Sequence, residues 1–189
     1  MTINDKLKKQ EIGTVIKQDI SEKQVRSTYL SIGSNIGNKK FNIENVKNLL
    51  LKNKIHILDC SNYYETPSWP NRNFPKFLNI ILKIKTDFSL VKLFVTIKKI
   101  EKKMGRKKSK KNYPRICDID IIDFKGQSTI VEYKHQKVIT PHPRMHTRNF
   151  VIFPLHELDK SWIHPKTKVK INNLINLFNH KDFSDIRIV

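Results

Sequence analysis

Hydrophobic residues along the chain recur with two spacings, which predicts a mixture of strands and helices. Apolar residues two apart, with many β-branched and aromatic side chains, are typical of strands, and apolar residues three and four apart are typical of amphipathic helices. In chain order the pattern predicts a strand, a helix, two strands, a helix and a strand over residues 28–33, 41–54, 55–66, 77–86, 90–104 and 116–124. Ser89 is a suitable N-cap for the second helix, and Gly105 suits its C-terminal end.

The predicted order βαββαβ is that of the ferredoxin-like arrangement. In this α+β fold an antiparallel sheet carries both helices on one face, so we expect the other face to be free for a ligand. C-terminal additions follow this core. The sequence predicts a hairpin or irregular excursion at 125–139, a helix at 143–158 that is interrupted at Pro154, and a short helix at 171–179.

The length of 189 residues predicts one folded domain, at 28–189. Residues 1–27 are polar and lack a sustained period, so we expect a flexible N-terminal extension. No apolar run approaches the roughly 18 residues of a membrane span, and no secretory signal is recognisable. Cys60 and Cys117 lack a paired spacing, which is typical of a reducing compartment. We therefore expect a cytoplasmic, monomeric protein without a membrane partner.

The formal net charge of +20 suggests a nucleic-acid partner at first sight. However, most of the cations are lysines dispersed along the whole chain, whereas a nucleic-acid surface concentrates cations and favours arginine. We therefore expect no nucleic-acid partner. One dense cluster, at 98–111, continues past Gly105 towards a pair of carboxylates. It is either a solvated helix face or a site for a phosphorylated ligand.

The most distinctive candidate site is Asp118-Ile119-Asp120, inside the predicted strand at 116–124. Side chains two apart on a strand share a face, so both carboxylates point the same way while Ile119 points into the opposite layer. Adjacent carboxylates repel each other unless a cation is present. Mg²⁺, which binds one or two carboxylates together with substrate phosphates, would remove that cost. An exposed acidic strand is the alternative.

A second candidate group lies between Pro141 and Phe150. His142 and His146 are four residues apart, but no third ligand with a zinc-site spacing accompanies them. We interpret His142 and Arg148 as phosphate donors near a helix N-terminus, with a capping or surface role as the alternative. The chain contains no GxxxxGK[ST], GxSxG or GxGxxG motif. A nucleotide would therefore be held by cationic side chains and magnesium.

Taken in order, several short motifs resemble those of one enzyme family, 6-hydroxymethyl-7,8-dihydropterin pyrophosphokinase. Each motif is weak alone, but the ordered set is specific, and the resemblance covers about residues 28–160. The motifs are Gly33-Ser34-Asn35, Tyr64-Glu65-Thr66-Pro67, Phe77-Leu78-Asn79, Glu101 with Gly105-Arg106, Pro114-Arg115-Ile116-Cys117-Asp118-Ile119-Asp120 and Pro141-His142-Pro143-Arg144-Met145.

The resemblance implies a ferredoxin-like enzyme of folate biosynthesis that moves the terminal pyrophosphate of ATP onto the hydroxymethyl group of the pterin and releases AMP. It implies two Mg²⁺ ions at Asp118 and Asp120, with ATP as co-substrate. By the same resemblance, Arg106 and Arg115 belong to loops that close over the phosphates during catalysis. The implied ATP-site residues are Glu101, Lys108, His142 and Arg148. The implied pterin-site residues are Thr66, Pro67, Trp69, Phe77, Asn79 and Phe150, with the two phenylalanines on either side of the ring.

The chain also departs from the family pattern between Arg106 and Arg115. Lys108 stands where a second arginine is usual, and Asn112-Tyr113 replaces a Trp-Gly pair, so a family member with impaired catalysis is one alternative. An RNA-binding module is another, because it can share the βαββαβ order. Its K/R-G-F/Y strand motif is missing, however, and paired aspartates would repel phosphate in the absence of metal.

Overall fold

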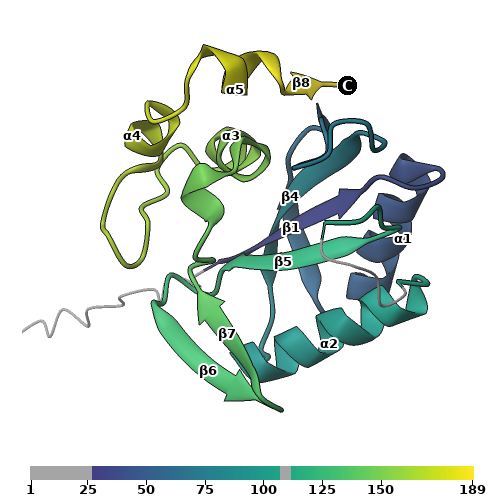
Figure 1. Cartoon of the computed structure of the whole chain (residues 1–189). Helices are drawn as coiled ribbons and strands as arrows, with labels where there is room; N and C mark the ends of the chain where they lie inside the picture. The colour runs from purple at the N-terminus through teal and green to yellow at the C-terminus, as the bar shows by residue number, and fades with distance from the viewer. Residues whose placement is uncertain (1–26, 107–111) are drawn as a thin grey trace, which may run out of the picture.

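The structure is a computed structural model that describes residues 27–106 and 112–189 (Figure 1). The predicted N-terminal extension at 1–27 therefore lies almost entirely outside the described residues. The core elements are β1 (Thr28–Ser34), α1 (Lys39–Lys52), β2 (His56–Cys60), β3 (Tyr64–Thr66), β4 (Phe77–Lys85), α2 (Leu90–Lys103) and β5 (Asp118–Asp123).

These strands form one antiparallel sheet in which β1 and β4 are the inner strands. The order is β5-β1-β4-β3, and β2 pairs with β4 beyond the end of β3. The predicted α+β, ferredoxin-like core is confirmed. A single strand was expected at 55–66, but it is divided into β2 and β3. The division occurs at Ser61, whose hydroxyl accepts a hydrogen bond from the backbone N–H of Ile81 at 2.9 Å, so that a side chain replaces part of the strand ladder.

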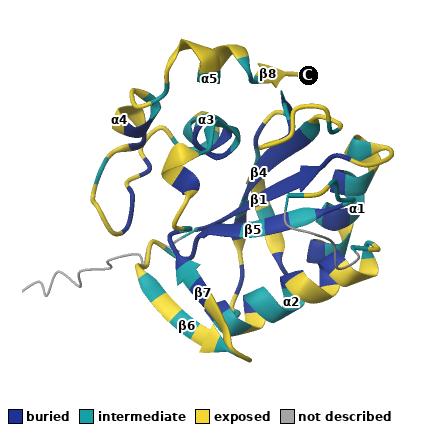
Figure 2. Ribbon diagram, viewed as in Figure 1, coloured by how far each residue is buried: buried dark blue, intermediate teal, exposed yellow. Residues whose placement is uncertain are grey.

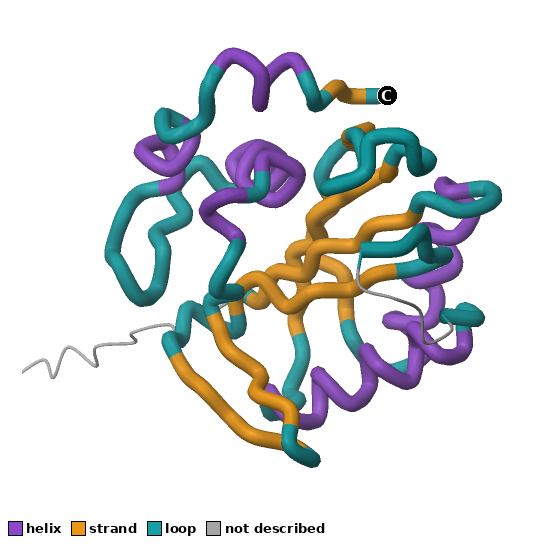
Figure 3. Tube along the Cα trace, viewed as in Figure 1, coloured by secondary structure: helices purple, strands orange, loops and turns teal. Residues whose placement is uncertain are grey.

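Both α1 and α2 pack on one face of the sheet, as expected (Figure 3). The predicted alternation of β4 is also confirmed, because Leu78, Ile80, Leu82 and Ile84 join this core while Ile81 lies on the other face. Ser89 caps α2 by accepting a hydrogen bond from the Lys92 N–H, and Gly105 follows its end with a φ of 86°. Helix α1 buries Ile43, Val46 and Leu50 in this core, whereas Phe41, in its first turn, is 60% exposed.

C-terminal elements cover part of the opposite face, which the sequence had predicted to be free. The C-terminal elements are β6 (Thr129–Tyr133), β7 (Gln136–Thr140), the 3₁₀ turn η1 (Met145–Thr147), α3 (Asn149–Leu158), α4 (Ile171–Ile175), α5 (His180–Ser184) and β8 (Arg187–Ile188). Of these, η1, α3 and α4 form a second core on the opposite face, whereas β6 and β7 pack with the core under α1 and α2, and β8 pairs with β3 in the sheet. In this second core, Val151 and Leu155 of α3 pack with Ile81 and Ile122 of the sheet (Figure 2). Among the described residues, the part of this face that carries Asp118, Asp120 and Asn79 lines a cavity.

Three other boundaries differ from the prediction. The expected helix at 143–158 begins only at Asn149, because Arg148 has an extended backbone and η1 precedes it. Pro154 does not end α3, since burial of the helix against the sheet outweighs one lost hydrogen bond. The last predicted helix ends at Ile175, and the strand β8 was not predicted.

The described residues also bear on compartment and membrane association. Cys117 is buried, Cys60 is half-buried, and both are free thiols. Burial raises the pKa of Cys117 to about 12. No helix in the described part of the chain is both long and apolar enough to cross a membrane.

Asp123, at the end of β5, joins the sheet to the C-terminal layer. Its carboxylate accepts hydrogen bonds from the indole N–H of Trp162 and the backbone N–H of Gly126, both at 2.9 Å. Burial nevertheless raises the pKa of Asp123 to about 6, from 3.8. The folded protein therefore holds the Asp123 proton more tightly than the unfolded chain does, so protonated Asp123 stabilises the fold. This stabilisation is fully present below about pH 4 and is lost as the pH rises through 6.

We therefore expect the stability of the wild-type protein relative to Asp123→Asn to depend on pH. The difference in their free energies of unfolding should fall by up to about 3 kcal/mol between about pH 4 and pH 7. Urea denaturation of both proteins across this range measures it. A difference that is constant with pH would contradict the assignment.

Candidate active site

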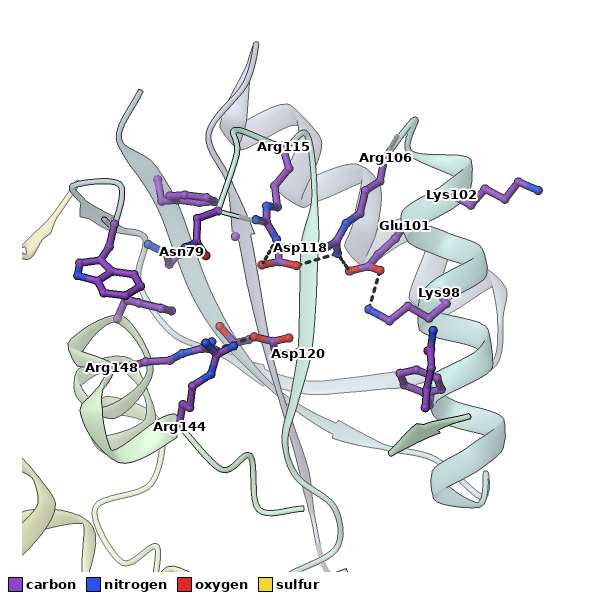
Figure 4. Close-up of a pocket in the computed structure, with 18 of the residues that line it drawn as sticks. Asn79, Lys98, Glu101, Lys102, Arg106, Arg115, Asp118, Asp120, Arg144 and Arg148 are labelled. Atoms are coloured by element: carbon purple, nitrogen blue, oxygen red, sulfur yellow. Dashed lines mark hydrogen bonds and ion pairs between the residues drawn. The ribbon is translucent and has the colours of Figure 1, made fainter. Parts of the chain in front are cut away.

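Most of the residues proposed from the sequence line one cavity of about 1330 Å³ (Figure 4). Its walls come from α2, from the open part of the sheet, from the loop after β3 and from the N-terminus of α3. The predicted residues that line it are Thr66, Pro67, Trp69, Phe77, Asn79, Glu101, Arg106, Arg115, Asp118, Asp120, Arg148 and Phe150. Lys108 lies outside the described residues. His142 lines a smaller adjoining cavity of about 200 Å³ instead.

Asp118 and Asp120 lie at the centre of this cavity on β5. They share a face of the sheet, as predicted, while Ile119 and Ile121 join the core under α1 and α2. Both carboxylates retain access to the cavity, since each side chain is 30% exposed. Two like charges on one open face require compensation from cations.

Three arginines supply that compensation. Arg106 and Arg115 each bind one carboxylate oxygen of Asp118, at 2.7 and 3.1 Å, and Arg148 binds Asp120 at 2.8 Å (Figure 4). The arginines come from the end of α2, from the segment before β5 and from the start of α3, so these three elements meet at the two carboxylates. A ligand that carries both phosphate and a metal ion could use the two members of each ion pair separately. The phosphate would bind the arginine, and the metal would bind the aspartate.

His142 faces Asp120 from the segment before η1, with its Nε2 atom 3.9 Å from the carboxylate. It does not lie at a helix N-terminus, because the turn after it is the short η1. Burial lowers the pKa of His142 to about 4, so it is neutral at pH 7. Burial by itself would raise the pKa of Asp120, but the basic groups around it, His142 and Arg148, reverse this effect and lower it. Since His142 is neutral at pH 7, Arg148 is the partner that keeps Asp120 ionised.

Glu101 is 3% exposed and is saturated by partners within the protein. Its carboxylate accepts a hydrogen bond from the backbone N–H of Ile119 at 2.9 Å and from Lys98 at 2.8 Å, and it also binds Arg106. Glu101 thus fixes the direction of two cations that line the cavity. This arrangement indicates a positioning role more than direct contact with a ligand.

At the other end of the cavity, an amide lies among aromatic side chains. Asn79 is 3% exposed, and its Nδ2 atom donates to the hydroxyl of Thr66 at 3.0 Å. Phe77 lies two residues away on the same face of β4 and lines the same cavity, as do Trp69 and Phe150. Gly33 lies opposite Asn79 in the β1–β4 register. A Cβ atom at Gly33 would come within 2.9 Å of Asn79 Oδ1, so only glycine leaves room for this amide.

Asn35 joins two of the loops around the cavity. Its Oδ1 atom accepts a hydrogen bond from the Arg115 N–H at 2.7 Å, and its Nδ2 atom donates to Ser68 at 3.2 Å and to the Pro75 carbonyl at 3.1 Å. The sequence had singled out Asn35 only as part of a motif. Its bridging role depends on loops that are distant in the chain, so no local signal could reveal it.

Further residues line the cavity that the sequence analysis did not name as individual site residues. They are Ser31, Gly33, Phe94, Val95, Lys98, Lys99, Lys102, Asn112, Tyr133, Lys134, Gln136, Arg144 and Thr147. Of these, Lys98, Lys99 and Lys102 belong to the 98–111 cluster, for which a phosphate site was one of the two interpretations. Lys98, Glu101 and Lys102 also have the i, i+3, i+4 spacing that places side chains on one side of a helix. Tyr133, Lys134 and Gln136 reach the cavity from the β6–β7 turn, for which the sequence gave no signal.

A family model described as 7,8-dihydro-6-hydroxymethylpterin-pyrophosphokinase (HPPK) matches residues 29–160. The chain belongs to the HPPK family. The matched residues include every site residue proposed from the sequence. The C-terminal 161–189 lie beyond the match.

Individual HPPK relatives agree with this assignment. The chain is 36% identical over 140 residues to the 2-amino-4-hydroxy-6-hydroxymethyldihydropteridine pyrophosphokinase of Aquifex aeolicus, covering 74% of this chain and 84% of that protein. It is 36% identical over 159 residues to the folic acid synthesis protein FOL1 of Dictyostelium discoideum, covering 84% of this chain but 23% of that protein.

A solved structure shows the same fold. Plasmodium falciparum HPPK-DHPS with pterin and p-hydroxybenzoate matches with a TM-score of 0.69 at 14% identity. The match covers 86% of this chain and 46% of that one. This chain therefore spans about half the length of that structure.

In this HPPK-family protein, we expect Glu101→Gln to lower the free energy of unfolding by about 2–3 kcal/mol. Oε1 of Glu101 accepts from both the Ile119 N–H and Arg106, and Oε2 accepts from Lys98. Glutamine keeps the first oxygen, but it turns an NH₂ donor towards the Lys98 ammonium and removes the negative charge that balances both cations. Lys98→Met removes only an exposed partner and should cost less than about 1 kcal/mol. Urea denaturation without ligands compares the two. Equal losses in the two variants would show that Glu101 does not organise this group of hydrogen bonds.

Proposed function

We propose that this HPPK-family protein transfers pyrophosphate from ATP to the hydroxymethyl group of 6-hydroxymethyl-7,8-dihydropterin and releases AMP. The observation that carries the proposal is the order of groups along one cavity. An aromatic and amide end, with Phe77 and Asn79, is separated from a lysine-rich helix by Asp118 and Asp120. Two substrates of different chemistry can therefore meet at the carboxylates. The names of the Aquifex and other relatives support the same reaction.

The two carboxylates are suitable ligands for magnesium. Among the residues that the structure describes, no group of three or more His, Cys, Asp or Glu side chains could hold a metal by itself. Mg²⁺ does not need such a group, because it commonly binds one or two carboxylates together with phosphates and water. We propose that Asp118 and Asp120 hold two Mg²⁺ ions together with ATP. Such ions would neutralise charge that develops on the phosphates.

The arginines are proposed to change partners when the nucleotide binds. Arg106, Arg115 and Arg148 now neutralise the aspartates. A triphosphate offers these guanidinium groups stronger, bidentate acceptors, and it leaves the aspartates free for the metal. During transfer the pterin hydroxyl oxygen bonds to the β-phosphorus and loses its proton to solvent, as the bond between the β-phosphorus and the bridging oxygen of AMP breaks. Positioning and neutralisation of charge are the main demands of such a step.

The pterin is proposed to bind at the aromatic end. A flat polar ring suits a site between Phe77 and Phe150, and the buried amide of Asn79 can hydrogen-bond its edge. Backbone groups at 66–69 would contribute further hydrogen bonds. Trp69 is 75% exposed and stands at the open side of this end, where it can cover the ring.

The nucleoside of ATP is proposed to occupy the smaller cavity between α2 and β7. This cavity adjoins Asp120, and its walls are mainly apolar, with Lys98 and the neutral His142 at its margin. A base placed there leaves its phosphates beside Asp118, Asp120 and the arginines. On this proposal His142 contacts the nucleotide, and Glu101 acts by holding Lys98 and Arg106. We further propose that the protein acts as a cytoplasmic monomer without nucleic acid.

The decisive experiment measures AMP release from ATP in the presence of magnesium, with and without the pterin. We expect AMP only when all three are present, and at least a 100-fold loss with either Asp118→Asn or Asp120→Asn, about the size of removing a preorganised charge-stabilising group. Full activity of either variant would refute the metal assignment. An inactive wild-type protein that binds both substrates would support the alternative of impaired catalysis. Tight, magnesium-independent RNA binding without turnover would support the RNA-binding alternative.

Gly33→Ala tests the pterin end separately. The added Cβ would lie 2.9 Å from Asn79 Oδ1, so the amide must shift, whereas its 3.4 Å distance to the Phe77 ring is an ordinary contact. We expect KM for the pterin to rise about tenfold, which corresponds to about 1.4 kcal/mol, while KM for ATP stays within about twofold. Steady-state kinetics with each substrate varied in turn measures both. Equal changes in the two constants would contradict the placement of the pterin.

A further inference from the structure

The C-terminal residues 180–189, called the C-terminal bracket below, connect α3 with the strand β3 and with the loop that follows it. The bracket contains α5 and β8 and runs from α3 to the outer edge of β3 (Figures 1 and 3). It lies beyond the residues that the HPPK family model matches. The roles proposed above do not involve it, yet it contacts α3 and the loop after β3, the two elements that carry Phe150 and Trp69 at the aromatic end.

One end of the bracket is fixed to α3. The ring of Phe183 lies 4.7 Å from that of Phe153, and the Nδ2 atom of Asn149 donates to the carbonyl of Asp182 at 2.8 Å. Asn149 immediately precedes Phe150, which lines the aromatic end of the cavity. The bracket is therefore attached beside one wall of the proposed pterin site.

The other end is fixed to the loop that forms the opposite wall. This loop, residues 67–76, connects β3 to β4 and carries Trp69. Arg72 in the loop donates two hydrogen bonds to Asp185, at 2.9 and 2.5 Å, in a bidentate pair. These hydrogen bonds keep the pKa of Asp185 below its ordinary value, so the pair is ionised at neutral pH.

Pairing of β8 with β3 adds a second attachment on this side. Glu65 lies opposite Arg187 in the register, and their side chains form an ion pair at 2.8 Å. Asn35 holds the base of the loop through Ser68 and the Pro75 carbonyl, whereas the bracket holds its middle through Arg72. Asn35 and the bracket therefore hold different parts of the loop.

We propose that the C-terminal bracket sets the separation between the 67–76 loop and the start of α3, and that Asp185 is a positioning residue for pterin binding. This inference rests on the proposed function for its substrate, but its structural part does not. Asp185 is far from the reacting groups and acts only through Arg72 and the loop. Loss of the pair should therefore weaken pterin binding and leave the nucleotide end unchanged.

A double-mutant cycle on the full chain tests the proposal. Asp185→Asn and Arg72→Gln should each raise KM for the pterin about two- to fivefold, as expected for an exposed ion pair of favourable geometry. The double variant should be no worse than either single variant, because both remove the same contact. KM for ATP should not change. Asp87→Asn, at an exposed position before α2, is the matched control and should have no effect.

Hydrogen–deuterium exchange supplies a readout that needs no activity. In Asp185→Asn we expect faster exchange of the amides at 68–76, with unchanged exchange in α1 and α2. Unchanged exchange in the loop, additive effects in the cycle, or equal changes in both KM values would overturn the proposal. If the loop loosens but the wild-type protein neither binds nor turns over the pterin, the bracket is supported and the proposed function fails.

Discussion

The site depends on one electrostatic constraint, which is that β5 presents two carboxylates on the same open face of the sheet. Residues 118 and 120 must share a face, because strand side chains alternate, and the neighbouring isoleucines are committed to the core. Arginines from three separate elements meet at these carboxylates and balance their charge. These ion pairs hold three segments beside the carboxylates, namely the end of α2, the segment before β5 and the start of α3. The cavity is the space that remains between them.

The C-terminal layer determines which part of the sheet can serve as a site. A ferredoxin-like sheet with helices on one face leaves a whole face available, but α3 and the elements around it bury one part against Ile81 and Ile122. The ligand space is therefore limited to the part that holds the carboxylates. The same layer supplies Arg148 and Phe150, so the element that closes the face also contributes to the cavity wall.

Local rules account for what the sequence could predict. The alternation of β4, the Ser89 cap and the shared face of Asp118 and Asp120 depend on residues within a few positions of one another, and all three are confirmed. Contacts between distant segments account for the rest. The break at Ser61 needs the Ile81 N–H, the position of His142 depends on Asp120, and β8 exists only because β3 has a free edge. No periodicity encodes such partners.

The charge of the chain shows that the positions of the cations matter more than their number. A net charge of +20 distributed over dispersed lysines does not identify a ligand. Inside the cavity, however, the arginines, Lys98 and Lys102 outnumber the carboxylates of Glu101, Asp118 and Asp120. A purely cationic groove would accept any polyphosphate chain, but central carboxylates repel phosphate that arrives without metal. A polyanion that brings its own divalent cation satisfies both signs of charge, and a metal-bound triphosphate is such a ligand. On the function proposed above, the carboxylates would bind the metal and the surrounding cations would bind the phosphates.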